Sequence, residues 1–349
     1  MPSSRREAGD TANKGRHTLN SELPIFVVGM QRSGTTLLQS ILTAHPNISI
    51  APETHFLNKM VKTEGNAEEA FKLFWSDYTR RDRFRSLNID PDHMESLIRE
   101  SGDLSFKNVF RTVLMQYATS RNKSRWGEKT PSHYAHLEQL LTWFPRASII
   151  VVVRDPRAVC CSLLSVYWRR ETRRLRNLEG QSTTRFRRIY HDAQTWQLHV
   201  QDLVSRWTRD ERVLIVRYED LVSDPQLMLT EIFTFLREPV VLDVLADGYR
   251  ADTGTVPDAE HRGGRGSWRR GHLARASGPI TTDSIDKWKE GLLDSEIMMI
   301  EKICRIGMGE MRYDAGSTKV DLGLGRIAGA VRYLWCDIYW RMSRKNKAI

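Results

Sequence analysis

The sequence lacks several features that would direct a protein to a membrane or to an oxidising compartment. It contains no uncharged apolar run of about 18 residues, so no membrane-spanning helix is expected. Residues 1–20 are polar and basic, without the apolar core of a signal peptide, and we expect a disordered basic tail. The four cysteines form no Cys-x-x-Cys pair and no Cys/His cluster with zinc spacing, which argues against a metal site and fits a reducing compartment. These absences favour a cytoplasmic protein.

One glycine-bounded loop lacks the lysine that nucleotide hydrolysis needs. An apolar run at residues 25–28, typical of a buried strand, breaks at Gly29, and a helical pattern begins at Thr35. A strand, a glycine loop and a helix N-terminus together form a phosphate-binding site, because free N–H groups point at the anion. The distance from Gly29 to Gly34 is that of a nucleotide-triphosphate loop, but Thr35 stands at the lysine position. We therefore expect a phosphate or sulfate site, with Arg32 as its cation, that lacks the usual means of ATP or GTP hydrolysis.

The net charge of +10 favours anionic partners: nucleotides, acidic glycans, nucleic acid or a membrane surface. Charge alone does not choose among them. Two stretches, residues 169–188 and 261–275, are rich in arginine. The stretch 169–188 fits a solvated helix face and a binding role equally well. A mobile loop accounts for the stretch 261–275.

Strand-like and helical patterns alternate along the chain. Pro156 and Pro225 each follow an aspartate, as is typical of a capped helix start. Alternation of this kind predicts an α/β, P-loop-like, three-layer fold with a central parallel sheet, whose ligands bind at the carboxyl ends of the strands. We expect one domain over residues 21–315. The expected strands are 25–28, 148–153 and 213–216, the mainly helical region is 60–125, and the irregular region is 241–285.

A second anion site is expected where the strand 148–153 ends. Arg154 stands at that strand end, and Ser162 follows one to two turns into the next helix, so the two side chains can grip one phosphate from two sides. With Arg32 on the first loop, two anion sites would flank adjacent strand ends. A nucleotide with phosphates at both its 5′ and 3′ positions would satisfy both sites.

At this point the sequence closely resembles the sulfotransferases that use 3′-phosphoadenosine 5′-phosphosulfate (PAPS). The resemblance extends over about residues 24–240 and is closest in motif to the tyrosylprotein and heparan-type glycan branches. Four blocks in the family's order carry it: Gln-Arg-Ser-Gly-Thr-Thr-Leu at 31–37, Gly-Glu-Lys-Thr-Pro at 127–131, Val-Val-Arg-Asp-Pro-Arg-Ala at 152–158 with Ser162, and Arg-Tyr-Glu-Asp-Leu at 217–221. Arginine replaces the loop lysine of several relatives, as it also does in the tyrosylprotein branch, whereas residues 262–277 match the family poorly.

The resemblance implies which residues bind the donor. It assigns the 3′-phosphate to Arg154 and Ser162, and it implies no metal. The residues that it assigns to the 5′-phosphosulfate are Arg32, Ser33, Gly34, Thr35 and Thr36.

The implied reaction is an in-line transfer of the sulfuryl group to a hydroxyl acceptor, with 3′,5′-bisphosphoadenosine leaving. Arg32 and Lys129 would stabilise the charge on the bridging oxygen. Glu53, about twenty residues after the loop, would be the general base that removes the hydroxyl proton. His55 and His133 are rival bases.

The acceptor is less constrained, and two other functions compete. The Glu53 pattern and the lysine segment 127–131 favour a glycan-type or protein hydroxyl over a small phenol. The alternatives are a P-loop small-molecule or nucleotide kinase and a basic nucleic-acid-binding protein, although no nucleic-acid module is present. Residues 316–349 are expected to form a basic amphipathic helical extension. Peripheral membrane contact through 326–347 competes there with docking on the domain or in a dimer.

Overall fold

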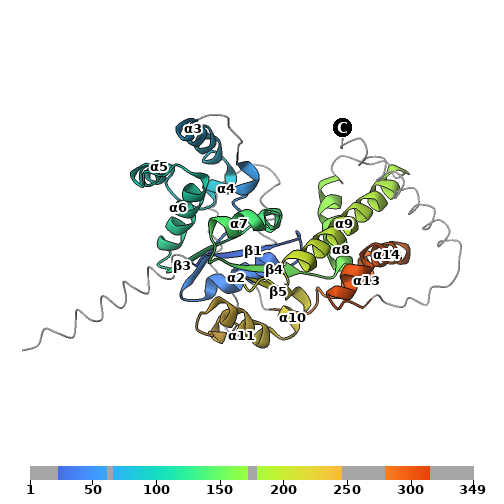
Figure 1. Cartoon of the computed structure of the whole chain (residues 1–349). Helices are drawn as coiled ribbons and strands as arrows, with labels where there is room; N and C mark the ends of the chain where they lie inside the picture. Colours follow the sequence, from blue (N-terminus) through green and yellow to red (C-terminus); the bar gives the residue numbers. More distant parts are fainter. Residues whose placement is uncertain (1–22, 61–65, 172–178, 246–279, 315–349) are drawn as a thin grey trace, which may run out of the picture.

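A five-stranded parallel sheet lies at the centre of the computed structural model, which describes residues 23–60, 66–171, 179–245 and 280–314 (Figure 1). The strand order is β2-β3-β1-β4-β5, so β1 pairs with β3 on one side and with β4 on the other. The strands are β1 (Ile25–Gly29), β2 (Ile48–Ala51), β3 (Arg125–Lys129), β4 (Ser148–Val153) and β5 (Val213–Arg217).

Helices connect the strands and cover both faces of the sheet (Figure 1). Three short 3-10 helices are η1 (Leu57–Lys59), η2 (Pro131–His136) and η3 (Leu242–Leu245). The α-helices are α2 (Thr35–Ala44), α3 (Ala67–Tyr78), α4 (Asp82–Arg85), α5 (Pro91–Glu100), α6 (Phe106–Thr119), α7 (Leu137–Trp143), α8 (Pro156–Glu171), α9 (Glu179–Arg206), α10 (Tyr218–Ser223), α11 (Pro225–Leu236), α13 (Trp288–Gly291) and α14 (Asp294–Glu310).

Alternate side chains of the strands enter two separate cores. In β1, Phe26 and Val28 join the core that includes side chains of α6, α7, α9 and α14, while Ile25 and Val27 join the core under α2 and α11. Successive side chains of a strand point to opposite faces, so burial on both faces requires the continuous apolar run seen in the sequence. The predicted three-layer α/β fold is confirmed.

The structure contains the three predicted strands and adds two strands that the sequence did not reveal. In β3, charged residues are buried together with Trp126, so no apolar run marks the strand. Arg125 is only 2% exposed, because its guanidinium binds the Leu236 carbonyl oxygen, the Glu238 carboxylate and the Ser148 hydroxyl. The other missed strand, β2, has only four residues.

The predicted helix starts agree with the structure. Asp155 accepts a hydrogen bond from the Arg157 amide at the start of α8, and Asp224 accepts one from the Leu227 amide at the start of α11. The first helix ends at Ala44, directly before His45, as the proline that follows requires. None of the helices in the described ranges is long and apolar enough to span a bilayer.

Several sequence expectations lie outside the described residues: the tail 1–20, the extension 316–349 with its candidate membrane segment 326–347, and the segment 262–277. Part of the arginine-rich stretch is described, and there Arg185 binds the Glu296 carboxylate while the Arg188 guanidinium lies over the Tyr167 ring. These two arginines contact the protein itself.

Two of the four cysteines, Cys160 and Cys161, lie in α8. Cys160 is buried, and burial raises the pKa of its thiol, so the thiolate that would react is disfavoured. Cys161 is only half-buried, in the same helix α8.

Candidate active site

Each of the five strands brings a candidate residue to the same edge of the sheet. The loop after β1 contains Arg32, the segment after β2 contains Glu53, and Lys129 is the last residue of β3. Arg154 follows β4 directly, and Tyr218 follows β5. Because the strands are parallel, their carboxyl ends meet at one edge, where open α/β sheets bind their ligands.

Both glycines that bound the first loop are required by close contacts. Gly29 has φ 144° and Gly34 has φ 97°, backbone conformations that residues with side chains rarely adopt. A Cβ atom on Gly34 would lie 2.3 Å from the Tyr218 ring, and one on Gly29 would lie 2.4 Å from the Val152 carbonyl oxygen. The loop can therefore approach β4 and β5 only with glycine at these two positions.

The loop contains a buried polar atom without a protein partner. Ser33 is fully buried, and no hydrogen bond to its Oγ is present in the structure. The helix α2 starts directly after the Gly34 N-cap, with Thr35 as its first residue. Buried hydroxyls are normally hydrogen-bonded, so this atom, beside a helix N-terminus, fits an anionic ligand in the loop.

Arg32 joins the two predicted anion sites. Its Nε donates a hydrogen bond to the Ser162 Oγ at 2.9 Å, and its carbonyl oxygen accepts one from the Arg154 Nη1 at 3.1 Å. The sequence had placed Arg32 in the 5′ site and the other two residues in the 3′ site. In the structure all three lie within one hydrogen-bonded group.

Two residues with no role assigned from the sequence complete the surroundings of Arg154. Its guanidinium lies 4.3 Å from the centroid of the Tyr218 ring, and its Nη2 donates to the Ser284 carbonyl oxygen at 2.6 Å. The Tyr218 hydroxyl also hydrogen-bonds the Ser284 Oγ. The Arg154 Nε is buried without a partner in the structure, so the guanidinium retains hydrogen-bonding capacity. Tyr218 lies within the block 217–221, which was the only signal for it.

A buried ionic cluster holds the start of α8, next to Arg154, which follows β4 directly. The Asp155 carboxylate binds the Arg157 guanidinium, whose Nη1 also contacts Glu301 of α14 at 2.8 Å. The same guanidinium lies 4.2 Å from the centroid of the Trp288 ring of α13. The cluster thus fixes this loop against two helices that follow much later in the chain.

Glu219, in the first turn of α10 directly after β5, supports the same loop. Its Oε1 accepts a hydrogen bond from the Asp155 amide at 3.0 Å, and its Oε2 accepts one from the Tyr313 hydroxyl at 2.8 Å. Burial raises the pKa of the Glu219 carboxyl, against these hydrogen bonds, which lower it. We interpret Glu219 as a residue that positions the loop.

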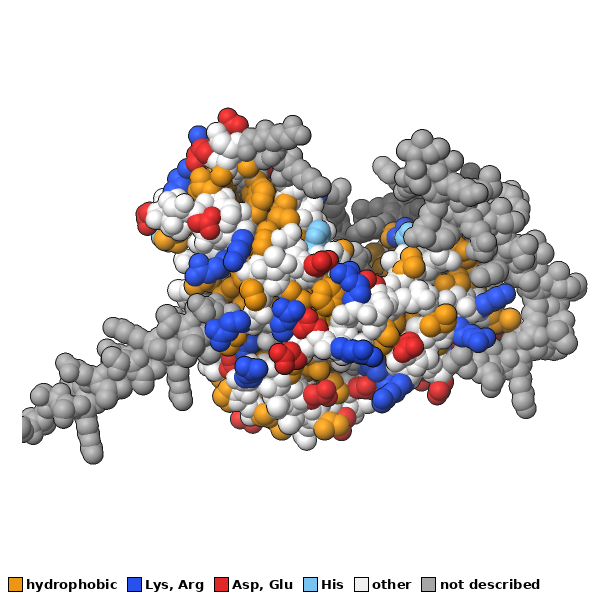
Figure 2. Space-filling model, viewed as in Figure 1, with side chains coloured by type: hydrophobic (Ala, Val, Ile, Leu, Met, Phe, Trp, Pro, Cys, Tyr) orange, Lys and Arg blue, Asp and Glu red, His pale blue; other side chains and the backbone are white. Residues whose placement is uncertain are grey.

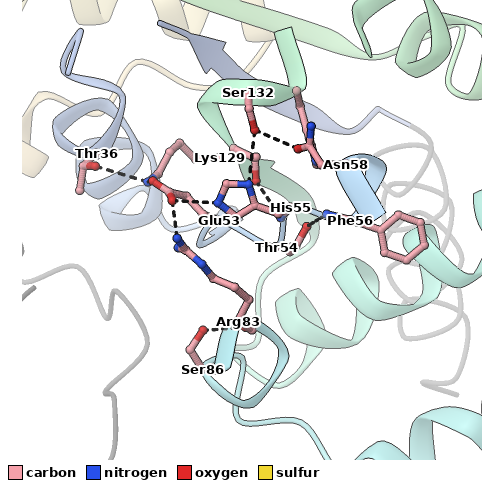
Figure 3. A network of polar contacts seen from close by, with 12 residues as sticks. Thr36, Glu53, Thr54, His55, Phe56, Asn58, Arg83, Ser86, Lys129 and Ser132 are labelled. Carbon is pink, nitrogen blue, oxygen red and sulfur yellow. Dashed lines mark hydrogen bonds and ion pairs between the residues drawn. The ribbon is translucent and has the colours of Figure 1, made fainter. Parts of the chain in front are cut away.

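Glu53 lies at the centre of a second group of side chains, shown in Figure 3. Its Oε1 accepts a hydrogen bond from the Lys129 Nζ at 2.9 Å, and its Oε2 accepts one from the Arg83 Nη1 at 2.9 Å. The His55 Nε2 lies 3.4 Å from the same Oε2. Lys129 also donates to the Thr36 Oγ1 at 3.3 Å, which connects this group to α2 and the glycine loop.

The surroundings of Glu53 keep it ionised. Burial by itself would raise the pKa of the Glu53 carboxyl, but Lys129, the hydrogen bond to His55 and the charge of Arg83 together hold it far below its usual value. The group is therefore a carboxylate at neutral pH, as a general base must be. In this state, however, both of its oxygens are engaged and its affinity for a proton is low.

The neighbouring acid, Glu128, has a different environment. It is buried and accepts hydrogen bonds from the Thr54 amide and hydroxyl, from the Thr130 hydroxyl and from the His133 Nδ1. The His133 Nε2 accepts a hydrogen bond from the Leu57 amide, so the ring proton is assigned to Nδ1, facing Glu128. Both nitrogens of this fully buried imidazole are thus engaged, which argues against His133 as the base.

His55 lies next to Glu53 and remains a candidate for assisting it. Its backbone has φ 53°, a left-handed conformation that is uncommon outside glycine. Its Nδ1 hydrogen-bonds the Ser132 Oγ at 3.3 Å, and Ser132 in turn donates to the Asn58 Oδ1 at 2.9 Å (Figure 3). The imidazole is held between this chain of hydrogen bonds and the carboxylate.

The face shown in Figure 2 is hollowed along its upper edge, between the helices α3 to α6 and the helices α8 and α9. Acidic, basic and histidine side chains are exposed along this hollow in the space-filling view. Within the described ranges, no group of three or more His, Cys, Asp or Glu side chains could hold a metal ion.

A parallel sheet with a glycine loop, a helix N-terminus and several cations at its carboxyl edge is the architecture of the P-loop-like class of folds. The profile of the sulfotransferase family matches residues 24–241, and the chain belongs to that family. The match includes Arg32, Glu53, Lys129 and Arg154, which the fold brings to one edge. It favours sulfuryl transfer over the kinase and nucleic-acid-binding alternatives.

Over the aligned segments, the chain is about a quarter to a third identical to several curated relatives. It is 24% identical over 237 residues to the protein-tyrosine sulfotransferase of Drosophila melanogaster, a match that covers 65% of this chain and 40% of the relative. It is 26% identical to protein-tyrosine sulfotransferase 1 of Danio rerio, covering 63% and 55%. The nodulation protein NoeE of Sinorhizobium fredii is 31% identical over 150 residues, covering 42% and 33%. The chain therefore spans about half the length of these relatives or less.

Solved structures with similar folds include two sulfotransferase domains. The domain from the curacin biosynthetic pathway has a TM-score of 0.55 and 23% identity, covering 84% of this chain and 99% of that domain. The domain from the Synechococcus PCC 7002 olefin synthase has a TM-score of 0.53 and 22% identity, covering 83% and 94%. At 22–23% identity, this similarity supports the fold of the chain and nothing beyond the fold.

Proposed function

We propose that the protein transfers a sulfuryl group from PAPS to a hydroxyl acceptor, with Glu53 as the general base. The observation that carries the proposal is the contact of 2.9 Å between the Glu53 carboxylate and the Lys129 ammonium at the edge that also holds the glycine loop. With these roles, a base for the acceptor would lie beside a cation for the donor.

Residues of the glycine loop and the start of α2 would bind the 5′-phosphosulfate of the donor. The buried Ser33 Oγ, which lacks a protein partner, supports this role, as do the two required glycines. Arg154 and Ser162 would bind the 3′-phosphate, and the unpartnered Arg154 Nε supports that assignment. Arg32 touches both of these residues, so it would contact the donor between its two anionic ends.

The donor supplies a sulfuryl group joined to a phosphate through an oxygen. Glu53 would accept the proton of the acceptor hydroxyl while that oxygen forms its bond to sulfur. The bond from sulfur to the bridging oxygen breaks, and the electron pair stays on 3′,5′-bisphosphoadenosine. Lys129 and Arg32 would stabilise the negative charge that develops on the bridging oxygen. For this, Lys129 must shift from Glu53 toward the donor, and the shift frees one carboxylate oxygen.

We propose a glycan-type or protein hydroxyl as the acceptor. Several relatives are named protein-tyrosine sulfotransferases, and the matching segment of the nodulation protein NoeE has the highest identity among the relatives described above. The position of Glu53 after β2 is compatible with either class of hydroxyl.

The proposal is tested by incubating the full chain with PAPS carrying labelled sulfate and a panel of glycans, peptides, lipids and phenols. We expect label in a glycan or peptide, and transfer slowed by about 10²–10⁴ with Glu53→Gln. Calorimetry should show binding of 3′,5′-bisphosphoadenosine without Mg²⁺. Binding of ATP that requires Mg²⁺, with no transfer of sulfate from PAPS, would support the kinase alternative instead.

A further inference from the structure

Arg83 reaches Glu53 from a separate group of helices. It belongs to the short helix α4, whose next residue, Phe84, is buried and packs edge-on against Trp75 and Tyr78 at centroid distances of 5.4 Å each. These ring contacts fix α4 on the helix α3. The Arg83 side chain extends from α4 to the Glu53 carboxylate, with Nη1 2.9 Å from Oε2 (Figure 3).

The two oxygens of Glu53 have different partners. Oε1 is held by Lys129, which the phosphosulfate of a bound donor would attract. Oε2 is held by Arg83, which lies on the side of the helices α3 to α6, away from the glycine loop. Binding of the donor would therefore free Oε1 from Lys129. It would not free Oε2, which stays bound to Arg83.

We propose that Arg83 is a gate on the base, and that an acceptor opens it by offering Arg83 an anionic group of its own. The inference rests on the proposed function and adds a substrate class to it: hydroxyl acceptors that carry a carboxylate, sulfate or phosphate close to the reacting hydroxyl. The acceptor's anion replaces Glu53 as the partner of the guanidinium, and the released carboxylate takes the hydroxyl proton.

The exchange follows from the charges at the site. A partly buried guanidinium that loses its carboxylate without a replacement is left uncompensated, so a neutral acceptor must break the pair unaided. An anionic acceptor restores the pair as it breaks the old one. The Arg83 side chain is 35% exposed, so an incoming anion can reach it, whereas the Lys129 side chain is only 5% exposed.

The exchange also activates the base. A cation beside a carboxylate lowers its pKa by about one to three units, so separation from Arg83 raises the proton affinity of Glu53. His55, which faces the same oxygen at 3.4 Å, and Lys129 on the other oxygen remain as its neighbours. An acceptor that opens the gate thus meets a stronger base than an acceptor that does not.

Matched acceptors test the proposal. Pairs that differ only in one charge, such as glucosides and glucuronides or Gln and Glu peptides, are compared in wild type and in Arg83→Gln by their kcat/KM values with labelled PAPS. We expect wild type to favour the anionic member by about tenfold, the factor that corresponds to 1.4 kcal/mol, and Arg83→Gln to lose this preference. Arg85→Gln, which removes an exposed arginine from the same helix, is the control that keeps the preference.

A pH profile separates gating from a merely structural role. In Arg83→Gln the acidic limb of kcat/KM should move to higher pH by about one unit, since Glu53 loses a neighbouring positive charge. An unchanged limb together with an unchanged preference for anionic acceptors would overturn the gate while leaving sulfuryl transfer intact. Absence of any transfer by wild type would overturn both proposals. Binding of 3′,5′-bisphosphoadenosine is the control that shows that each variant is folded.

Discussion

Replacing Glu53 by glutamine is the sharpest test of the assigned base. Glutamine has nearly the same shape, and its amide oxygen can still accept the hydrogen bond that Lys129 donates at 2.9 Å. What disappears is the negative charge and the ability to take a proton. The substitution therefore changes the chemistry of the site with little change in its packing.

The expected loss is large and specific to the chemical step. A general base contributes about 10²–10⁴ in rate, equivalent to about 3–5 kcal/mol of the barrier, and we expect kcat to fall by this factor. The affinity for 3′,5′-bisphosphoadenosine should stay the same or rise, because Lys129 and Arg83 then face a neutral amide and the site becomes more positive. Loss of rate without loss of nucleotide affinity is the expected signature.

The assay combines single-turnover transfer of labelled sulfate with calorimetric titration of the nucleotide. A Glu53→Gln variant that retains its rate to within about tenfold would refute the assignment. In that case His55 is the next candidate, and His55→Asn is the suitable variant, since asparagine tolerates the left-handed backbone found there. Equal losses of rate and nucleotide affinity would instead indicate a damaged site.

Four further substitutions have expected outcomes. Gly34→Ala should weaken binding of 3′,5′-bisphosphoadenosine by more than about tenfold and lower the free energy of unfolding by about 1–2 kcal/mol. The reason is that the new Cβ atom would collide with the Tyr218 ring. An unaltered calorimetric titration and an unaltered melting curve would contradict this. Arg154→Ala and Ser162→Ala should each weaken PAPS more than adenosine 5′-phosphosulfate, and equal weakening of both nucleotides would place these residues elsewhere. Burial lowers the pKa of His199 from 6.5 to about 4, so the unfolded chain binds more protons between these values and stability must fall as the pH drops through this window. The free energy of unfolding should change by at most about 1.4 kcal/mol per pH unit in this window. Urea unfolding at pH 7 and pH 5 measures this change, and it should be smaller in His199→Phe than in wild type.

Much of the sheet could be predicted because its central strands are buried on both faces. Burial on both faces demands an apolar run, and the central strands β1 and β4 each have one. The edge strand β5 also has an apolar run, although it is only partly buried. The strand β3 escaped prediction because its buried charges are neutralised by distant parts of the chain, as with Arg125 and Glu238. No local sequence pattern indicates a pairing between residues so far apart in the chain.

The candidate site was predictable to the extent that its residues stand next to strand ends. Arg32, Glu53, Lys129 and Arg154 occur in short motifs, and the parallel sheet brings those motifs together. Arg83 could not be predicted, since it lies 30 positions after Glu53 in a helical region without a motif, and only the packing of α4 brings it to the carboxylate.

The late helices α13 and α14 bear on where the functional unit ends. The family profile stops at residue 241, yet Glu301 and Trp288 hold Arg157, and Tyr313 holds Glu219. A chain that ended where the profile ends would leave the Arg157 guanidinium with half of its ion pairs. The loop that contains Arg154 would also lose the helices α13 and α14 that pack against it. The family profile therefore ends before the residues that hold this loop in place, and truncated variants of this protein should keep residues up to 314.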